Sequence, residues 1–186
     1  TTHPRVPMTI RLRLAADSEG SLVAKSSDVI ADNGAYSNEA PAITGIASYR
    51  MDNLYRIPNV KNQYRLVYTN KLPTGGYRGF GNPQGAFALE SGVDILAKEL
   101  GMDPAALRMK NFVRPGDVTM HGFRIGSAEI RECVEKAKSE TDWDRKRAGG
   151  FEPPASSPRG KAILRGVGMA CCIHGSGFRG AYGDFD

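Results

Sequence analysis

Hydrophobic and polar residues alternate near the start of the chain, and this alternation predicts two strands. Over residues 8–15 every second residue is apolar, so one side of the segment is expected to face a core and the other to face water. After a polar turn over 17–20, a second strand is expected over 22–31, ending at Asn33-Gly34. The pattern therefore predicts an antiparallel hairpin. The apolar positions of its first strand are Met8, Ile10, Leu12 and Leu14.

A three- and four-residue spacing of apolar side chains later in the chain predicts a long amphipathic helix. Asn82 is expected as its N-cap, Pro83 at its first position and Gly101 just beyond its last. One face of this helix should be buried. The apolar stripe on that face consists of Ala86, Leu89, Val93, Leu96, Ala97 and Leu100.

Shorter elements are expected on both sides of this helix. Small apolar residues over 40–48 favour a short helix, and 64–68 has the pattern of a strand. Asp103 followed by Pro104 predicts a helix that reaches about Asn111.

The last third of the chain is expected to hold one more helix, a linker and a strand. Ser127 should open the helix, with inward-facing residues Ile130, Cys133, Val134 and Ala137. Gly, Pro and Ser dominate 148–160, which predicts a surface loop or linker, and a strand is expected over 166–173. Because strands and helices do not alternate regularly, the predicted fold class is α+β, with an antiparallel hairpin and mixed strands.

Composition narrows the class of protein. Of the 186 residues, 40% are apolar and 24% are charged, a mixture typical of a folded domain and not of a disordered or fibrous chain. No apolar run approaches the roughly 20 residues that a membrane-spanning helix needs. We therefore expect no membrane span.

Charge and cysteine content bear on partners and compartment. The chain has 25 Lys and Arg against 20 Asp and Glu, so an anionic partner has to be considered. The densest basic group, 145–147, is typical of a solvated surface turn, and nucleic-acid binding is not expected. A disulfide between the neighbours Cys171 and Cys172 would be strained, which indicates a reducing compartment such as the cytoplasm.

The glycine-rich segment just before the long helix is the main candidate for chemistry. Glycine lets the main chain approach a neighbour closely, and N–H groups at a helix start favour an anion or a metal-bound oxygen. The sequence lacks the Gly-Lys-Ser/Thr of a phosphate loop, and Gln84 stands where a dinucleotide fingerprint needs Gly. The alternative is a tight turn before a capped helix, but Arg78 and Phe80 have little local packing reason to lie among glycines. The four glycines are Gly75, Gly76, Gly79 and Gly81.

Two other arrangements are weaker candidates. Cys172 and His174 would share a strand face as a nucleophile and its base, but their spacing is too wide for a good hydrogen bond, and a small buried cysteine is the favoured interpretation. The three histidines are widely separated and no Cys-x-x-Cys pair exists, so no zinc site is expected.

Three carboxylates stand beside turn residues. Asp32, Glu39 and Asp52 each have the chemistry of a catalytic acid. Carboxylates in such places usually serve as caps or solvated charges, and that interpretation is favoured for all three.

Several stretches of the chain carry distinctive residues in a fixed order. They are Tyr68-Thr69-Asn70 with Pro73; Tyr77-Arg78-Gly79-Phe80-Gly81-Asn82-Pro83-Gln84 with Glu90; Ala31-Asp32-Asn33-Gly34-Ala35-Tyr36; Asp52-Asn53-Leu54-Tyr55 with Ile57-Pro58-Asn59; and Leu100-Gly101-Met102-Asp103-Pro104 with Arg108, Lys110 and Asn111. These stretches resemble the molybdopterin-binding large subunit of the xanthine oxidase and aldehyde oxidase family of molybdenum hydroxylases. The likeness covers nearly the whole chain.

The resemblance implies roles for individual loop residues. The backbone amide of Arg78 would face the oxygen ligand of the molybdenum, with Tyr77 and Gly76 completing that surface. Phe80 would pack on the ring of the substrate. The implied cofactor-binding residues are Gly76, Tyr77, Arg78, Gly79, Gly81 and Gln84.

The resemblance also implies cofactors, partners and domain limits. Residues 1–147 would be part of a molybdopterin-binding domain, 148–160 a linker and 161–186 the start of a following strand region, all within an internal segment of a longer polypeptide. The cofactor would be molybdenum-molybdopterin, its cytosine dinucleotide form included among the alternatives. Its partners would be the rest of the large subunit and the domains or subunits that carry 2Fe-2S clusters and FAD.

The implied activity is hydroxylation of an aromatic heterocycle or aldehyde, or reaction of an aromatic CoA thioester. Ile46 stands where members that act on purines carry arginine, so the resemblance does not favour a purine. The segment with the general-base glutamate of the family is absent from these 186 residues, so no catalytic acid or base is expected here. The alternative function is a catalytically silent module that binds an anionic ligand.

Overall fold

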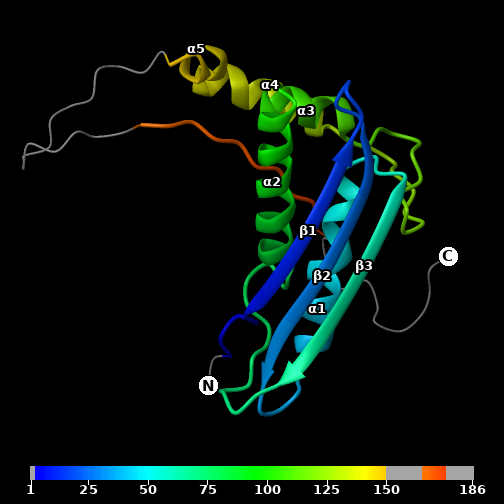
Figure 1. Ribbon diagram of the computed structural model, residues 1–186, viewed down its shortest axis with the longest axis vertical. Coiled ribbons are helices and arrows are strands. Elements are labelled where there is room, and N and C mark those ends of the chain that lie inside the picture. The colour runs from blue at the N-terminus through cyan, green and yellow to red at the C-terminus, as the bar shows by residue number, and fades with distance from the viewer. Residues whose placement is uncertain (1–2, 150–164, 175–186) are drawn as a thin grey trace, which may run out of the picture.

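The computed structural model describes residues 3–149 and 165–174 (Figure 1). Its elements are β1 (Met8–Ala16), β2 (Leu22–Gly34), α1 (Ala40–Tyr49), the 3-10 helix η1 (Arg50–Leu54), β3 (Asn59–Tyr68), α2 (Asn82–Glu99), α3 (Pro104–Asn111), α4 (Ile130–Thr141) and α5 (Trp143–Arg147). The strands form one sheet in the order β1-β2-β3. β1 and β2 are antiparallel, whereas β2 and β3 are parallel and joined through α1 and η1.

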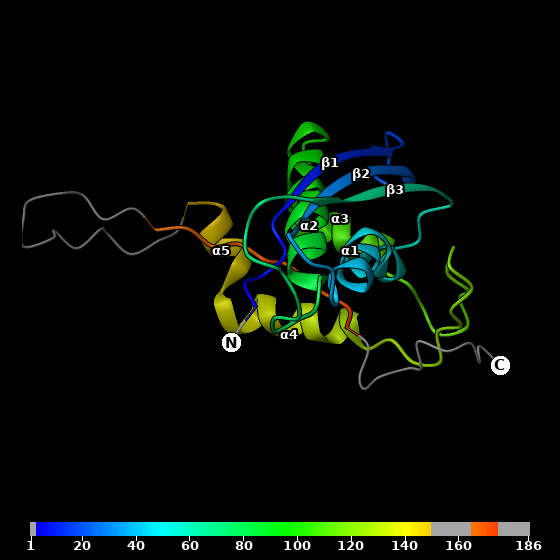
Figure 2. The same cartoon turned by 90° about the horizontal axis from the view of Figure 1, so that it is seen from below.

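The sheet and its helices form layers. Helices α1 and α2 lie against one face of the sheet, α2 beside β1 and α1 beside β3 (Figure 2). Residues of β1 alternate between partly buried and exposed, as the sequence pattern requires. The predicted α+β class and hairpin are confirmed, and β3 begins at Asn59, earlier than the expected 64.

Helices α1 and α2 approach each other unusually closely. A Cβ atom added at Gly81 would lie 2.4 Å from the carbonyl oxygen of Ile43, and one at Gly85 would lie 2.5 Å from that of Ala47. Gly81 also has φ of 95°, which any other residue would adopt only under strain. The two glycines thus let the first turn of α2 lie directly on the backbone of α1.

A buried ion pair ties α2 to α3. The Arg108 side chain is fully buried, and its Nε donates to Glu90 Oε2 at 2.8 Å. Tyr55 Oη donates to the other Glu90 oxygen at 2.6 Å. Burial lowers the pKa of Arg108, but the charge of Glu90 and its hydrogen bonds outweigh that effect and raise it. Arg108 therefore stays charged within the main core.

The helix boundaries agree with the sequence at most ends. Gly101 follows α2 with φ of 65°, and the Asp103 side chain caps α3, as predicted. The prediction that Asn82 caps α2 is wrong, because Gly81 occupies the cap position. Helix α4 begins at Ile130, not at Ser127, and its Cys133 is exposed. None of the described helices is long and apolar enough to cross a bilayer.

The prediction of a strand over 166–173 is wrong. Residues 165–174 have no regular secondary structure, and Val167, Met169 and Ile173 pack on the main core. The apolar side chains of this segment pack on the cluster that includes Leu89 and Val93 of α2. The backbone of the segment pairs with no strand in the described chain. The basic group 145–147 is the last part of α5, not a turn, while 150–160 of the expected linker lies outside the described residues.

Asp103 is expected to contribute to stability through both of its oxygens. Oδ1 accepts from the amides of Ala105 and Ala106, and Oδ2 accepts from the indole of the buried Trp143 at 2.9 Å. Losing both contacts in Asp103→Ala should lower the free energy of unfolding by about 2 kcal/mol. Asp103→Asn keeps the cap and should lose about half of that.

Denaturant unfolding of the purified protein measures this effect. Asp144→Ala is the matched control, because Asp144 is exposed and, among the described residues, its side chain makes just one contact, 3.5 Å from Lys138. Equal destabilisation by the Asp103 and Asp144 substitutions would contradict the assignment.

Candidate functional site

The glycine-rich segment 74–81, here called the glycine loop, joins β3 to α2. It lies at the end of the sheet where β1 begins and α1 starts (Figure 1). The buried Thr74 fixes its entrance: the amide donates to Asn33 O at 3.0 Å and the hydroxyl donates to Asp32 O at 2.8 Å. The amide of Gly75 donates to Pro4 O at 3.2 Å. The loop is therefore attached to the end of β2 and to the first residues of the chain.

Two consecutive tight turns carry the loop into α2. Phe80 N donates to Tyr77 O at 2.9 Å, with Gly79 at φ of 92°, as the third position of a type II turn requires. Asn82 N then donates to Gly79 O at 2.9 Å across Phe80 and Gly81, which both have positive φ. This second turn has the signs of a type I′ turn.

Glu39 holds the first part of the loop. Its Oε2 accepts from the Gly76 amide at 2.7 Å, and a Cβ atom on Gly76 would lie 2.3 Å from that oxygen. Glu39 stands at the N-cap position of α1 but makes no capping bond there. Glu39 is exposed, as expected of a solvated charge, but the expectation that it is a cap is wrong. No local pattern in the sequence links it to Gly76.

Arg5 and Gln84 hold the later part. Arg5 Nη2 donates to Arg78 O at 3.1 Å, and Arg5 Nη1 contacts Gln84 Oε1 at 3.5 Å. Gln84 Nε2 donates to Val6 O at 3.1 Å. The Arg5 guanidinium also lies over the Tyr77 ring, 4.5 Å from its centroid. The sequence motifs place Gln84 at this loop but give no indication of Arg5.

The glycine loop uses its carbonyl groups within the protein but leaves several of its N–H groups without a partner in the described chain. The carbonyls of Tyr77, Arg78 and Gly79 all accept from protein N–H groups. Within the described chain, the N–H groups of the same three residues have no partner, and Gly76, Tyr77 and Arg78 are exposed. Such a row of amides is a site for a negatively charged or oxygen-bearing group. The donor set therefore fits a ligand of the kind that molybdopterin represents.

Phe80 has a packing role that the sequence did not indicate. Its ring is half-buried and packs on a small cluster of apolar side chains beneath the loop. That cluster consists of Val6, Ala31, Ala40 and Ile43. The expectation that Phe80 lacks a local packing reason is wrong, whereas Arg78 projects from the surface.

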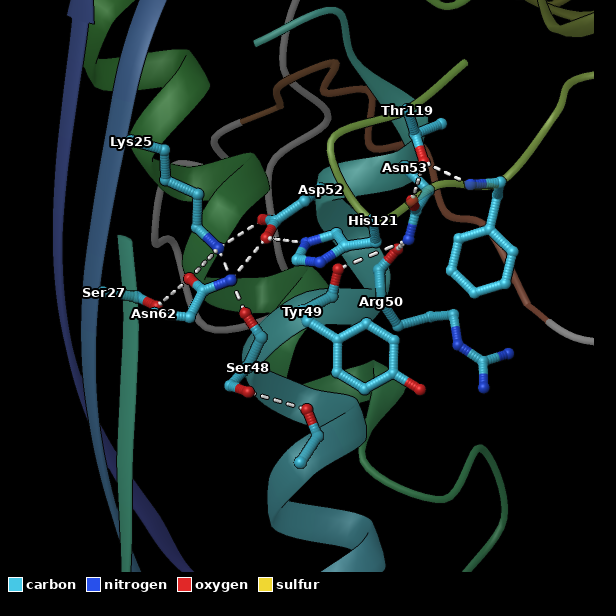
Figure 3. Close-up of polar contacts among 12 residues, drawn as sticks. Lys25, Ser27, Ser48, Tyr49, Arg50, Asp52, Asn53, Asn62, Thr119 and His121 are labelled. Carbon is cyan, nitrogen blue, oxygen red and sulfur yellow. Dashed lines mark hydrogen bonds and ion pairs between the residues drawn. The ribbon is translucent and has the colours of Figure 1, made fainter. Parts of the chain in front are cut away.

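A second polar cluster lies between the sheet and η1 (Figure 3). Lys25 and Asp52 form a buried ion pair, and Lys25 Nζ also donates to Ser48 O at 3.1 Å and to Asn62 Oδ1 at 2.9 Å. Asn62 Nδ2 donates to the second oxygen of Asp52 at 2.6 Å. His121 Nε2 lies 3.0 Å from that same oxygen and joins the 113–129 loop to the cluster.

This cluster is a structural crosslink. Burial lowers the pKa of Lys25, and the Asp52 charge partly offsets this effect. All three ammonium donors of Lys25 are used within the protein, so it is not free to act on a substrate. Asp52 is buried, and the prediction of a solvated or capping carboxylate is wrong. The sequence did contain one indication of this buried pair, because Lys25 stands at an inward-facing position of β2.

Comparison with known proteins decides the family. The model of the molybdopterin cofactor-binding domain matches residues 1–112. The chain belongs to this family. The resemblance carried by the loop motifs is thereby confirmed.

The relatives of this family member are longer proteins. It is 34% identical over 171 residues to the xanthine dehydrogenase molybdenum-binding subunit of Escherichia coli O157:H7, covering 91% of this chain and 22% of that one. It is 35% identical over 137 residues to the nicotinate dehydrogenase large molybdopterin subunit of Eubacterium barkeri, covering 73% and 32%. The chain therefore spans a fifth to a third of these relatives.

A solved structure supports the same fold. The aldehyde oxidoreductase of Desulfovibrio gigas superposes with a TM-score of 0.73 at 33% identity, covering 82% of this chain and 17% of that chain. The small mixed sheet and its helices are thus a fragment of that domain architecture.

Asp32 organises the approach to the glycine loop in this molybdopterin cofactor-binding chain. Its carboxylate accepts from Lys71 and Thr69, each at 2.6 Å, and from the Gly34 amide at 3.0 Å. These contacts, Lys71 first, lower the pKa of Asp32 to about 2. Asp32 thus caps the Gly34 amide, as expected of a carboxylate beside a turn, and it also binds Thr69 and Lys71 just after β3.

The stability contributed by ionised Asp32 should depend on pH. Because its pKa is depressed on folding, the contribution is present above the unfolded pKa of about 4 and is lost as pH falls through about 2. The difference in denaturation midpoint between wild type and Asp32→Asn should be constant above pH 5 and shrink below pH 4. A difference independent of pH would contradict this assignment.

The cysteines of this family member differ in exposure. Cys171 is buried and its amide donates to Glu90 Oε2 at 2.7 Å, whereas Cys133 and Cys172 are exposed. His174 contacts Asn82 through Nδ1, and no contact with Cys172 exists within the described chain. The structure does not bring Cys172 and His174 together as a nucleophile and its base.

The rate of alkylation should distinguish the buried thiol from the two exposed thiols. Burial and the nearby Glu90 charge raise the pKa of Cys171 to about 11. Iodoacetamide at pH 8 should modify Cys171 at least about tenfold more slowly than Cys133 or Cys172, measured by peptide mass spectrometry. Equal rates would mean that 165–174 does not cover the core in solution.

Proposed function

We propose that this chain forms the glycine-loop wall of the cofactor site in a molybdopterin-dependent oxidoreductase. The N–H groups of Tyr77, Arg78 and Gly79, which have no partner in the part of the chain that the structure describes, carry the proposal, because they offer fixed donors to an oxygen-bearing cofactor. Family membership and the names of the relatives support the same reaction class.

The chain's own residues bind and orient; they do not move protons. The N–H groups of 77–79 would hold cofactor oxygens, with Gly76, Gly81 and Gln84 fixing the shape of the loop. The part of the Phe80 ring left uncovered would contact a planar substrate. Asp32, Glu39 and Asp52 all accept internal hydrogen bonds, so none serves as acid or base. When bound, the cofactor supplies the oxygen nucleophile and the electron sink.

The substrate proposed for the whole enzyme is an aldehyde or an aromatic heterocycle. Proteins named aldehyde oxidoreductase and nicotinate dehydrogenase are among the relatives, which supports both classes. Ile46 is an apolar residue at the position where purine-specific members are expected to carry arginine, and this favours a substrate other than a purine. An aromatic CoA thioester is the further alternative.

The remaining assignments follow from the same proposal. The cofactor is molybdenum-molybdopterin, including its cytosine dinucleotide form, and electrons leave through 2Fe-2S and FAD partners in the cytoplasm. Residues 1–147 belong to the molybdopterin-binding domain and 148–160 to a linker. Nucleic acid is not a partner.

A matched pair of glycine substitutions tests the proposal. Gly79 and Gly116 have nearly equal φ values, 92° and 91°, so alanine carries the same backbone strain at both. A Cβ atom at Gly79 would lie 2.6 Å from the Pro83 ring, whereas one at Gly116 meets nothing within 4 Å. Gly79→Ala should therefore distort the loop, and Gly116→Ala should not.

Molybdenum analysis of the purified full-length protein gives the result. Wild type and Gly116→Ala should carry stoichiometric metal, and Gly79→Ala should lose it by at least about tenfold. A metal-free wild-type protein that still binds an anionic ligand would favour the catalytically silent module instead. Equal molybdenum in all three proteins would show that the loop does not hold the cofactor.

A further inference from the structure

The peptide bond between Arg78 and Gly79 is the centre of the first loop turn. In a planar trans peptide the C=O and N–H groups point in opposite directions. Whatever fixes the Arg78 carbonyl therefore also fixes the direction of the Gly79 N–H. The latter is one of the three unpartnered donors of the glycine loop.

This peptide has two accessible orientations in principle. Type I and type II turns share the hydrogen bond from the fourth residue to the first, here Phe80 N to Tyr77 O, and differ in the direction of the central peptide. Glycine populates the backbone angles of both types readily. Gly79 alone thus permits the observed orientation but does not enforce it.

Arg5 makes the contact that distinguishes the two orientations. Its guanidinium donates to Arg78 O at 3.1 Å, from the side of the loop that faces the chain start. The same guanidinium lies over the Tyr77 ring and reaches Gln84 Oε1, so its own position is fixed from two further sides. Flipping the central peptide would break this charge-assisted bond.

We propose that Arg5 is a positioning residue that holds the Arg78–Gly79 peptide with its N–H directed away from the protein, toward the bound ligand. The ligand identity rests on the proposed function; the orienting role rests on the Arg5 contacts alone. Arg5 touches neither substrate nor reacting atoms and acts through the peptide. Removing it should leave the loop in place but let the central peptide sample both orientations.

Three variants of the full-length holoenzyme test the role. Arg5→Ala removes the bond to Arg78 O, and Arg5→Lys keeps a cation that can donate to the same carbonyl but cannot also reach Gln84. Arg11→Ala is the control, since Arg11 lies on the exposed side of β1. Hydrogen exchange by mass spectrometry reads the amides of 77–80, with β2 as the internal reference.

The expected result is local. In the holoenzyme the bound ligand would protect the N–H groups of 77–79, and loss of the Arg5 bond should speed exchange of these amides by about tenfold in Arg5→Ala, with partial recovery in Arg5→Lys and no change in β2. For the reaction, kcat should fall by about tenfold while KM changes little, because a misdirected donor weakens transition-state stabilisation. Arg11→Ala should match wild type in both measurements.

Exchange of 77–80 unchanged in Arg5→Ala would overturn the orienting role, whatever the activity. Faster exchange in β2 as well as in the loop would also overturn it, because Arg5 would then stabilise the whole sheet. A wild-type protein without molybdenum would refute the proposed function. In that protein the Phe80 amide, which donates to Tyr77 O, is the reporter of the turn, and its faster exchange in Arg5→Ala would still support the orienting role. Full activity of Arg5→Ala with faster loop exchange would show that the Gly79 N–H does not serve the reaction and would overturn its direction toward the ligand.

Discussion

Close contact between α1 and α2 determines where the glycine loop can lie. Gly81 and Gly85 allow the first turn of α2 to rest on the carbonyls of Ile43 and Ala47, at separations that no side chain would permit. This contact brings the loop beside the start of α1, within reach of Glu39. Larger residues at the two glycines would push α2 outward, and the loop would lose its supports together.

The loop separates its acceptors from its donors. Its carbonyls accept from amides of the same turns and from Arg5, whereas the N–H groups of 77–79 have no partner among the described residues. A patch of main chain thereby acquires positive potential without depending on a mobile lysine or arginine side chain. The ordering cost of such a site is met during folding, by Thr74, Glu39 and Gln84, and not when the ligand arrives.

Local pattern predicted the parts of the fold that depend on neighbours in sequence. Alternation in β1, the stripe of α2 and the cap at Asp103 were all found, because each acts within a few residues. Contacts across long separations were missed: Lys25 with Asp52, and Arg5 with Arg78. The apolar pattern over 166–173 was misinterpreted as a strand because burial against a helix gives a similar signal. The loop itself was identified, but not what holds it.

The contacts of the buried Glu90 carboxylate limit which substitutions the sequence can accept during evolution. One carboxylate accepts from Tyr55, Arg108 and the amide of Cys171, which come from three separate segments. Replacing Arg108 alone strands the Glu90 carboxylate in the core, whereas replacing Glu90 alone leaves Arg108 its second carboxylate partner, Asp94, at 2.7 Å. The order of replacement should therefore matter along a lineage: Arg108 should be lost only after Glu90 has been replaced.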